Sequence, residues 1–184
     1  NEISMISKEF NINSNELISL ANKHPRVNIL NPGCGVGGHC IAVDPWFIAS
    51  ALPNKTQLIQ TSRRVNINKT KWVVNQIMIK IKEIKKKLKR EPKVTCLGIS
   101  YKPDIDDFRE SPALSIVENL NNLKVDLKIC EPYISHHKDF NLIQVKDIFI
   151  ESDLIVLLVA HSCFKKLNFK NIEILDFCGL TNNS

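Results

Sequence analysis

The sequence predicts an α/β protein in which a helical segment precedes a small domain built on a parallel sheet. Two observations support this prediction. Up to about residue 92, the apolar residues recur at helical spacing. From residue 93, short apolar runs alternate with polar helical segments, as in strands that crossover helices join into a parallel sheet with helices on both faces. We therefore divide the chain into 1–92, a helical region, and 93–184, a Rossmann-like domain.

Helices make up most of the first region. Between the second and the third of them, a loop over 23–38 holds four of the six glycines. Pro45 suits the first turn of a helix, where its missing N–H is not needed. Pro92 cannot continue a helix and therefore closes the longest one. The predicted helices are 3–10, a second that begins at a Ser14 cap, one from about 44 or 45 to 51, and 55–90.

Four strands are predicted in the second region. Two cysteines, Cys96 and Cys130, lie inside β-branched runs, so we expect them to behave as small buried hydrophobes. Trp46 and Trp72 are also expected in the core. The predicted strands are 94–99, 125–130, 154–159 and 172–177, and the helices between them are 112–123 and 145–151.

Length and composition exclude several classes of protein. The 184 residues are 43% hydrophobic, which suits one ordinary domain, or a small domain with an appendage, that folds without disulfides. The longest apolar run, 154–160, is far shorter than the ~20 residues that cross a bilayer, and we expect no signal peptide. The six cysteines form no CxxC pair, so no metal site is predicted. A cytoplasmic protein without a membrane partner is expected.

The net charge of +6 comes largely from one predicted helix. Its basic residues are interleaved with Ile77, Ile81 and Ile84, whose helical spacing makes the basic residues the solvated side. No aromatic residue is interleaved to stack on bases, so we predict no nucleic-acid partner. The basic residues are Lys80, Lys82, Lys85, Lys86, Lys87, Lys89, Arg90 and Lys93.

The glycine-rich loop matches the letters of a dinucleotide-binding fingerprint. Residues 33–38 read GCGVGG, which fits G-x-G-x-x-G. That fingerprint also needs a preceding strand, a helix that opens at the third glycine, and an acidic residue ~20 positions further on. Here Pro32 interrupts the approach, and the corresponding ribose region, 54–58, has no acid. We interpret the match as coincidental.

The loop leads directly into a cysteine that could be a nucleophile. Cys40 follows the glycines, and Asp44 comes four residues later, so the two share a face if the segment is helical. A thiol near backbone N–H groups at a helix start is favoured as the nucleophilic thiolate, and a nearby carboxylate can move a proton or hold water. A buried cysteine beside a flexible loop is the equal alternative on spacing alone.

Two longer motifs give the sequence a family resemblance. Residues 35–47, GVGGHCIAVDPWF, resemble the nucleophile segment of the UDP-glucose/GDP-mannose dehydrogenase family. Residues 101–113, YKPDIDDFRESPA, are similar to the signature of that family's C-terminal domain. The order and separation of the motifs also fit. Within the family, HPRVN at 24–28 and AVDPW at 42–46 favour members that act on UDP-N-acetylmannosamine, with UDP-glucose and UDP-N-acetylglucosamine as close alternatives.

The resemblance implies a reaction and an assembly. Such enzymes oxidise the C6 alcohol of a nucleotide sugar to a carboxylate in two hydride transfers, with two NAD+. A thiolate adds to the intermediate aldehyde, and water later releases the acid from a thioester. By this resemblance Cys40 is the nucleophile, Asp44 assists proton transfer or the hydrolytic water, and the helical region 1–92 forms a homodimer.

The same resemblance assigns the binding residues. Arg109 matches an arginine that contacts NAD, although with its acidic neighbours it could instead form a surface ion cluster. Tyr101 could be a plain strand-end aromatic, and His24 an ordinary loop histidine. His136, His137 and His161 match no family position and are expected at the surface or as caps. The residues matched to substrate binding are His24, Arg26, Gly37, Tyr101 and Lys102, the first two of which often reach a neighbouring subunit's site.

Two departures from the family pattern limit these expectations. The family's N-terminal dinucleotide-binding domain is not in the sequence, and the apolar pattern is already under way at Ile3, so we expect a part of a longer enzyme, inactive alone. Cys178 stands where the family has a basic residue that contacts ligand. The alternatives are a non-catalytic UDP-sugar-binding or dimerisation module and, more remotely, a hydrolase that uses Cys40 with His39.

Overall fold

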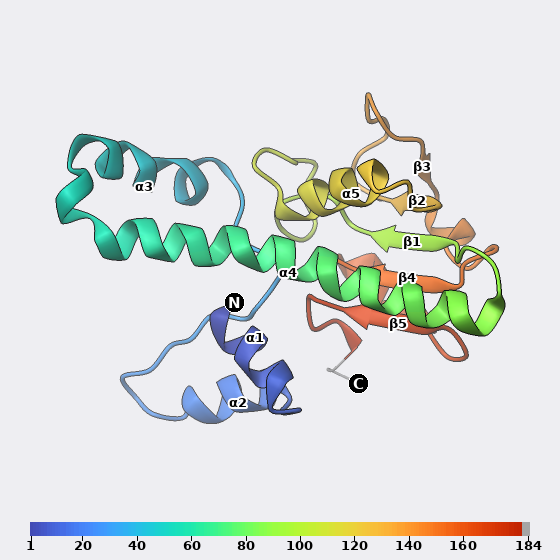
Figure 1. Cartoon of the computed structure of the whole chain (residues 1–184), viewed down its shortest axis with the longest axis horizontal. Coiled ribbons are helices and arrows are strands. Elements are labelled where there is room, and N and C mark those ends of the chain that lie inside the picture. Colours follow the sequence, from blue (N-terminus) through green and yellow to red (C-terminus); the bar gives the residue numbers. More distant parts are fainter. Residues whose placement is uncertain (182–184) are drawn as a thin grey trace.

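Five parallel strands form one sheet in the order β3-β2-β1-β4-β5 (Figure 1). The structure is a computed structural model that describes residues 1–181. The chain runs from β1 outward to β2 and β3, and then returns to the other side of β1 for β4 and β5. The strand order therefore reverses between β1 and β4, and a crevice can open beyond the carboxyl ends of these two strands. The prediction of an α/β fold is confirmed. The strands are β1 (Val94–Leu97), β2 (Leu127–Cys130), β3 (Leu142–Ile143), β4 (Leu154–Leu157) and β5 (Glu173–Asp176).

The two faces of the sheet are covered differently. Two long helices pack on the face that contains Cys96, whereas 3-10 turns and their flanking segments cover the face that contains Cys130. The expectation of helices on both faces is therefore wrong for the second face. The helix predicted over 145–151 is one 3-10 turn, because Val145 and Ile148 recur at the i,i+3 spacing of that turn. These elements are α4 (Gln57–Leu88), α5 (Pro112–Asn122), η2 (Val145–Asp147) and η3 (Ser162–Lys166).

The helix α4 joins the two predicted regions. Its second half contributes Val73, Ile77 and Ile81 to the core against the sheet. Its first half carries α3 and α1 on its sides (Figure 1). The division at residue 92 stays a prediction, since the core extends across it. The remaining helices are α1 (Glu2–Glu9), α2 (Ser14–Ala21), α3 (His39–Ala51) and the short 3-10 turn η1 (Pro53–Lys55).

Two helix starts differ from the predicted ones. The cap of α2 is Asn13, whose side chain accepts hydrogen bonds from the next two free amides, so Ser14 is the first helical residue instead. The helix α3 begins at His39, well before the predicted start near 44, because the left-handed backbone of Gly38 (φ 84°) turns the chain into it. Pro45 therefore lies inside the helix rather than in its first turn.

The tryptophans divide between core and surface. Trp72 is half-buried and makes an edge contact with Phe177, with ring centroids 6.1 Å apart. Trp46 is 40% exposed on α3, so its predicted place in the core is wrong. The neighbouring residues of α3 are also apolar and exposed, because this helix packs mainly against α4 and its buried residues lie outside the two core clusters of the sheet.

Several basic side chains of the predicted solvated face bind acidic groups of the sheet. Lys80 Nζ lies 2.7 Å from Glu173 at the start of β5. Arg90 forms a two-pronged ion pair with Asp153, with both nitrogen–oxygen distances 2.7 Å. These exposed pairs dock the end of α4 on the strand ends, although each stabilises little. Although α4 is long, no helix within residues 1–181 is apolar enough to cross a membrane.

Candidate active site

The glycine-rich loop lies directly against the second sequence motif. The Gly38 N–H donates a hydrogen bond to the Arg109 carbonyl oxygen at 3.2 Å. A Cβ on Gly37 would stand 2.4 Å from the carbonyl oxygen of Glu110 and 3.0 Å from the Cβ of Tyr101. A Cβ on Gly38 would meet the Tyr101 ring at 2.9 Å. The close backbone approach that only glycine permits therefore joins the two motifs.

Two polar residues of α4 bind the backbone of this loop. Asn66 accepts the Val36 N–H at 2.8 Å and donates to the Val36 carbonyl at 3.1 Å. The Thr70 hydroxyl donates to the Cys34 carbonyl at 3.1 Å. We did not predict either residue, since a polar residue within a helical pattern gives no sign of what it binds. The loop is thus fixed on both sides before it enters α3.

Cys40 and Asp44 lie on the first turns of α3, and both side chains are exposed. Their i,i+4 spacing places them on one face, as predicted. The free N–H groups and the dipole at the start of α3 favour an anion there, which suits a thiolate. Asp107 chiefly raises the pKa of the nearby Arg109 guanidinium, and Cys40 adds a smaller electrostatic contribution.

We expect Cys40 to be the first cysteine that iodoacetamide modifies. It is exposed, whereas the other five cysteines are buried or half-buried. Burial raises the pKa of both Cys34 and Cys130 to about 12, so their thiolate fractions are negligible at neutral pH. Peptide mass mapping after brief alkylation should find the label on Cys40, and Cys40→Ser should remove the early-labelled peptide. Early labelling of Cys163 in its place would contradict this expectation.

A cleft of about 300 Å³ opens at the carboxyl edge of the sheet. The turn after β1 supplies Tyr101 and Lys102, the segment after β4 supplies Ala160, and the glycine-rich loop closes one side. Cys178 lines the same cleft after β5, at the position where a basic residue was expected. This crevice lies where the strand order reverses, which is the usual ligand position in an open α/β sheet.

A half-buried carboxylate shapes the turn after β5. Asp176 accepts hydrogen bonds from the backbone N–H groups of Cys178, Gly179 and Thr181. Burial acts to raise the pKa of Asp176, but these hydrogen bonds outweigh it and hold the pKa below its usual range. The Asp176 carboxylate therefore holds Cys178 through its backbone N–H. Burial raises the pKa of the Cys178 thiol.

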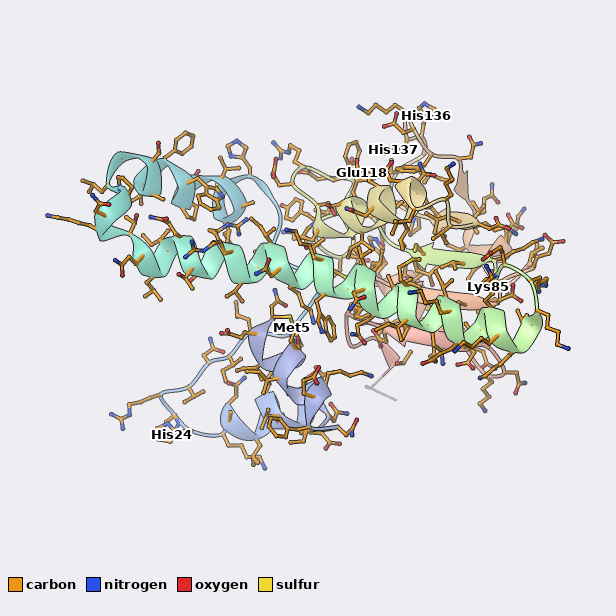
Figure 2. The ribbon with its side chains drawn as sticks, in the orientation of Figure 1. Met5, His24, Lys85, Glu118, His136 and His137 are labelled. Atoms are coloured by element: carbon orange, nitrogen blue, oxygen red, sulfur yellow. The ribbon has the colours of Figure 1, made fainter. Side chains whose placement is uncertain are left out.

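His24 and Arg26 lie apart from the other predicted site residues. Both are exposed on the loop that follows α2, and Figure 2 shows His24 on that loop, on the opposite side of α4 from α3. Within one chain, neither residue belongs to the cleft that Tyr101 and Lys102 line. The placement agrees with the expectation that they serve a neighbouring subunit, which stays a prediction.

Arg109 is exposed and paired. Its Nη2 lies 2.7 Å from an oxygen of Asp107, and its Nε lies 3.0 and 3.1 Å from the two oxygens of the same carboxylate. Of the acidic neighbours that could form a surface ion cluster with Arg109, Asp107 pairs with it, whereas Asp106 takes no part in these bonds. A pyrophosphate would have to compete with Asp107 for the guanidinium.

Among residues 1–181, no group of three His, Cys, Asp or Glu side chains could hold a metal.

Two histidines expected at the surface or as caps are buried. His161 precedes η3 as its cap residue, but its side chain makes no capping bond and is fully buried. His137 is 4% exposed and packs against Phe108 and Phe140. Figure 2 shows His136 and His137 together beyond α5. A lone histidine gives no signal of burial in the sequence, and each of these is buried because segments distant in the sequence surround it.

A parallel sheet with a cleft at its switch point, and an exposed thiol at the helix start that follows the loop beside it, define a class of ligand-binding α/β protein with a candidate nucleophile. Comparison with known families agrees. The family model for the UDP-glucose/GDP-mannose dehydrogenase UDP binding domain matches residues 95–176, and the model for the central domain matches 1–68. The chain belongs to the UDP-glucose/GDP-mannose dehydrogenase family.

Individual relatives span the whole chain. It is 45% identical over 186 residues to the UDP-N-acetyl-D-mannosamine dehydrogenase of Campylobacter jejuni, a match that covers 97% of this chain and 44% of that protein. It is 43% identical to the NDP-N-acetyl-D-galactosaminuronic acid dehydrogenase of Ralstonia solanacearum, with 98% and 43% covered. The UDP-N-acetyl-mannosamine dehydrogenase structure from S. aureus has a TM-score of 0.78 and 36% identity, with 98% and 47% covered. The chain thus spans under half the length of these relatives.

Proposed function

We propose that this chain supplies the nucleophile and the UDP-sugar cleft of a dehydrogenase that oxidises UDP-N-acetylmannosamine to UDP-N-acetylmannosaminuronate. One observation supports the proposal above all: the glycine loop that leads into Cys40 packs on Tyr101, which lines the switch-point cleft. A nucleotide held in that cleft can present its sugar towards the start of α3. The two relatives named as UDP-N-acetylmannosamine dehydrogenases support the choice of sugar.

Different residues of the chain would bind the substrate and carry out the chemistry. Tyr101, Lys102 and the backbone at Gly37 would hold the substrate, with Lys102 exposed and free to meet phosphate charge. The Cys40 thiolate would add to the carbonyl carbon of the C6 aldehyde, and its sulfur would later leave when water attacks the thioester. Asp44, one turn further along α3, would take the proton of that water.

The oxidant would be NAD+, two molecules per sugar, but the described residues do not form its pocket. The glycine-rich loop follows no strand, and α3 opens at His39 with no acidic residue placed for a ribose. Arg109 is the residue matched to the cofactor, and Asp107 already binds its guanidinium. We therefore derive no step through NAD+ from the residues of this chain.

A homodimer would complete the site. The exposed side of α3 and the start of α4 carry large apolar residues, with Phe47 at 70% and Leu58 at 80% exposure. A groove of about 440 Å³ between Ile41, Pro45 and Leu58 lies in this apolar area. An apolar surface of this kind is typical of a subunit interface. We place the protein in the cytoplasm.

The test is turnover by this chain joined to a family dinucleotide-binding domain. We expect NADH formation with UDP-N-acetylmannosamine at a higher kcat/KM than with UDP-glucose or UDP-N-acetylglucosamine. The 184 residues alone should bind UDP, as calorimetry can show, but produce no NADH. Preference for UDP-glucose would reassign the substrate. UDP binding without turnover by the joined protein would favour the non-catalytic module instead.

A further inference from the structure

A cluster of buried polar side chains lies directly beneath the cleft, and the proposed reaction does not use it. It consists of Glu131 after β2, His161 after β4 and Ser100 after β1. The side chains of Glu131 and His161 are both 0% exposed. Buried ionisable groups are rare unless they are paired, so a specific set of contacts must hold this cluster.

Glu131 binds the backbone of the turn that follows β1. Its Oε2 accepts the N–H groups of Ile99 and Ser100 at 2.8 and 3.1 Å, and its Oε1 accepts the Tyr133 N–H at 3.1 Å. Burial acts to raise the pKa of Glu131, but hydrogen bonds from His161 and the Ile99 amide outweigh it, so the carboxyl is a stronger acid than usual. The group is therefore an anion that accepts four hydrogen bonds.

His161 holds the other end of the same turn. Its Nδ1 accepts the Asp104 N–H at 2.9 Å, so this nitrogen carries no proton. Its Nε2 lies 3.1 Å from Glu131 Oε2 and therefore bears the hydrogen of the neutral ring, which it donates to that carboxylate. The Asp104 backbone N–H and the Glu131 carboxylate thus fix the tautomer of His161. Asp104 needs this support, since its backbone is left-handed, with φ 61°.

Ser100 closes the cluster between these two ends. Its hydroxyl donates to the Lys102 carbonyl at 2.9 Å and lies 3.3 Å from His161 Nε2. The turn from 99 to 104 is therefore held at its first residues by Glu131, in the middle by Ser100, and at its end by His161. The only two side chains of this turn matched to substrate, Tyr101 and Lys102, are carried on the part so clamped.

We propose that His161 and Glu131 are positioning residues for the UDP-sugar cleft, buried side chains that fix the 99–104 turn and thereby the placement of Tyr101 and Lys102. This inference rests on the proposed UDP-sugar site. Neither residue would touch substrate. Their effect would pass through hydrogen bonds to the backbone, and it differs from a purely structural role because it is exerted on a ligand-bearing turn.

Three substitutions separate the contacts of His161. Asn can place an oxygen where Nδ1 lies and keep the Asp104 bond, while Gln can place an N–H where Nε2 lies and keep the Glu131 bond. His161→Leu removes both bonds. Calorimetry with UDP on the 184-residue chain, well below the unfolding temperature, should show affinity about tenfold weaker for His161→Leu, with smaller losses for the Asn and Gln variants.

A packing variant supplies the control. Phe164 is fully buried and makes an edge contact with the His161 ring, at a centroid distance of 5.4 Å, but it has no polar bond to the turn. Phe164→Leu should lower the unfolding temperature and leave UDP affinity unchanged. If His161→Leu behaves in the same way, His161 is merely structural and the proposal is overturned.

Amide hydrogen exchange keeps the inference testable without UDP. The Asp104 amide should exchange much faster in His161→Leu and His161→Gln than in His161→Asn. If the wild-type chain does not bind UDP yet shows this exchange pattern, the proposed function fails while the clamp on the turn stands. Equal protection of Asp104 in all three variants would refute the clamp itself.

Discussion

Cys40→Ala should leave the complete enzyme able to oxidise the alcohol once but unable to make the acid at a useful rate. The first hydride transfer needs no thiol, whereas the second needs a carbonyl carbon to which a nucleophile has added. We expect the rate of acid formation to fall by at least about a thousandfold, as in other enzymes that lose their nucleophile. The measurement is the ratio of NADH to acid, which should rise well above the two NADH per acid of the wild type, because the variant forms NADH with aldehyde and little acid.

The control for this variant is Cys163→Ala. Cys163 is half-buried in η3, and burial raises the pKa of its thiol, so it is not placed to attack a substrate. We expect that variant to keep full activity. Acid formation at the wild-type rate by Cys40→Ala would show that the thiol at the start of α3 has no covalent role, whatever the cleft binds.

Much of this site could be predicted because its residues are neighbours in the sequence. Cys40 and Asp44 are four residues apart, and one helix is enough to place them on one face. The strands β1 and β4 could be predicted because each is a short, largely apolar run buried on both faces, interrupted in β1 only by Thr95. The two-residue strand β3 could not be predicted, since Leu142 and Ile143 make too short a run to stand out.

The residues that support the site could not be predicted, because each acts across a long stretch of chain. His161 binds Glu131, thirty residues away, and Asp104, fifty-seven away. Asn66 holds Val36 from the middle of a helix. A periodic pattern reports which side of an element is buried, but it does not report which loop returns to that side. The letters of the glycine loop match a dinucleotide-binding fingerprint that we interpret as coincidental, while the tertiary fold shows that Gly35, Gly37 and Gly38 are needed for packing.

Gly37→Ala should be the most damaging small substitution in the loop. The new Cβ would stand 2.4 Å from the Glu110 carbonyl oxygen and 2.8 Å from the Cδ of Pro112. Both neighbours are backbone or a rigid ring, so the loop itself must move away from the second motif. Overpacking of this kind costs about 1–3 kcal/mol of stability. A shift of the loop also moves the start of α3, so we expect kcat to fall about a hundredfold.

Gly33→Ala is the matched control, because its Cβ would meet nothing closer than the Gly35 carbonyl oxygen at 3.9 Å. The same change of one methyl group should there alter the free energy of unfolding by less than about 0.5 kcal/mol and leave kcat intact. Chemical denaturation of the 184-residue variants and steady-state kinetics of the same variants joined to a dinucleotide-binding domain separate an effect on stability from an effect on catalysis. If Gly37→Ala loses stability but keeps kcat, the contact between the loop and Glu110 serves folding alone, and the position of Cys40 does not depend on it. If both variants behave like wild type, the loop is not packed against the second motif as the structure has it.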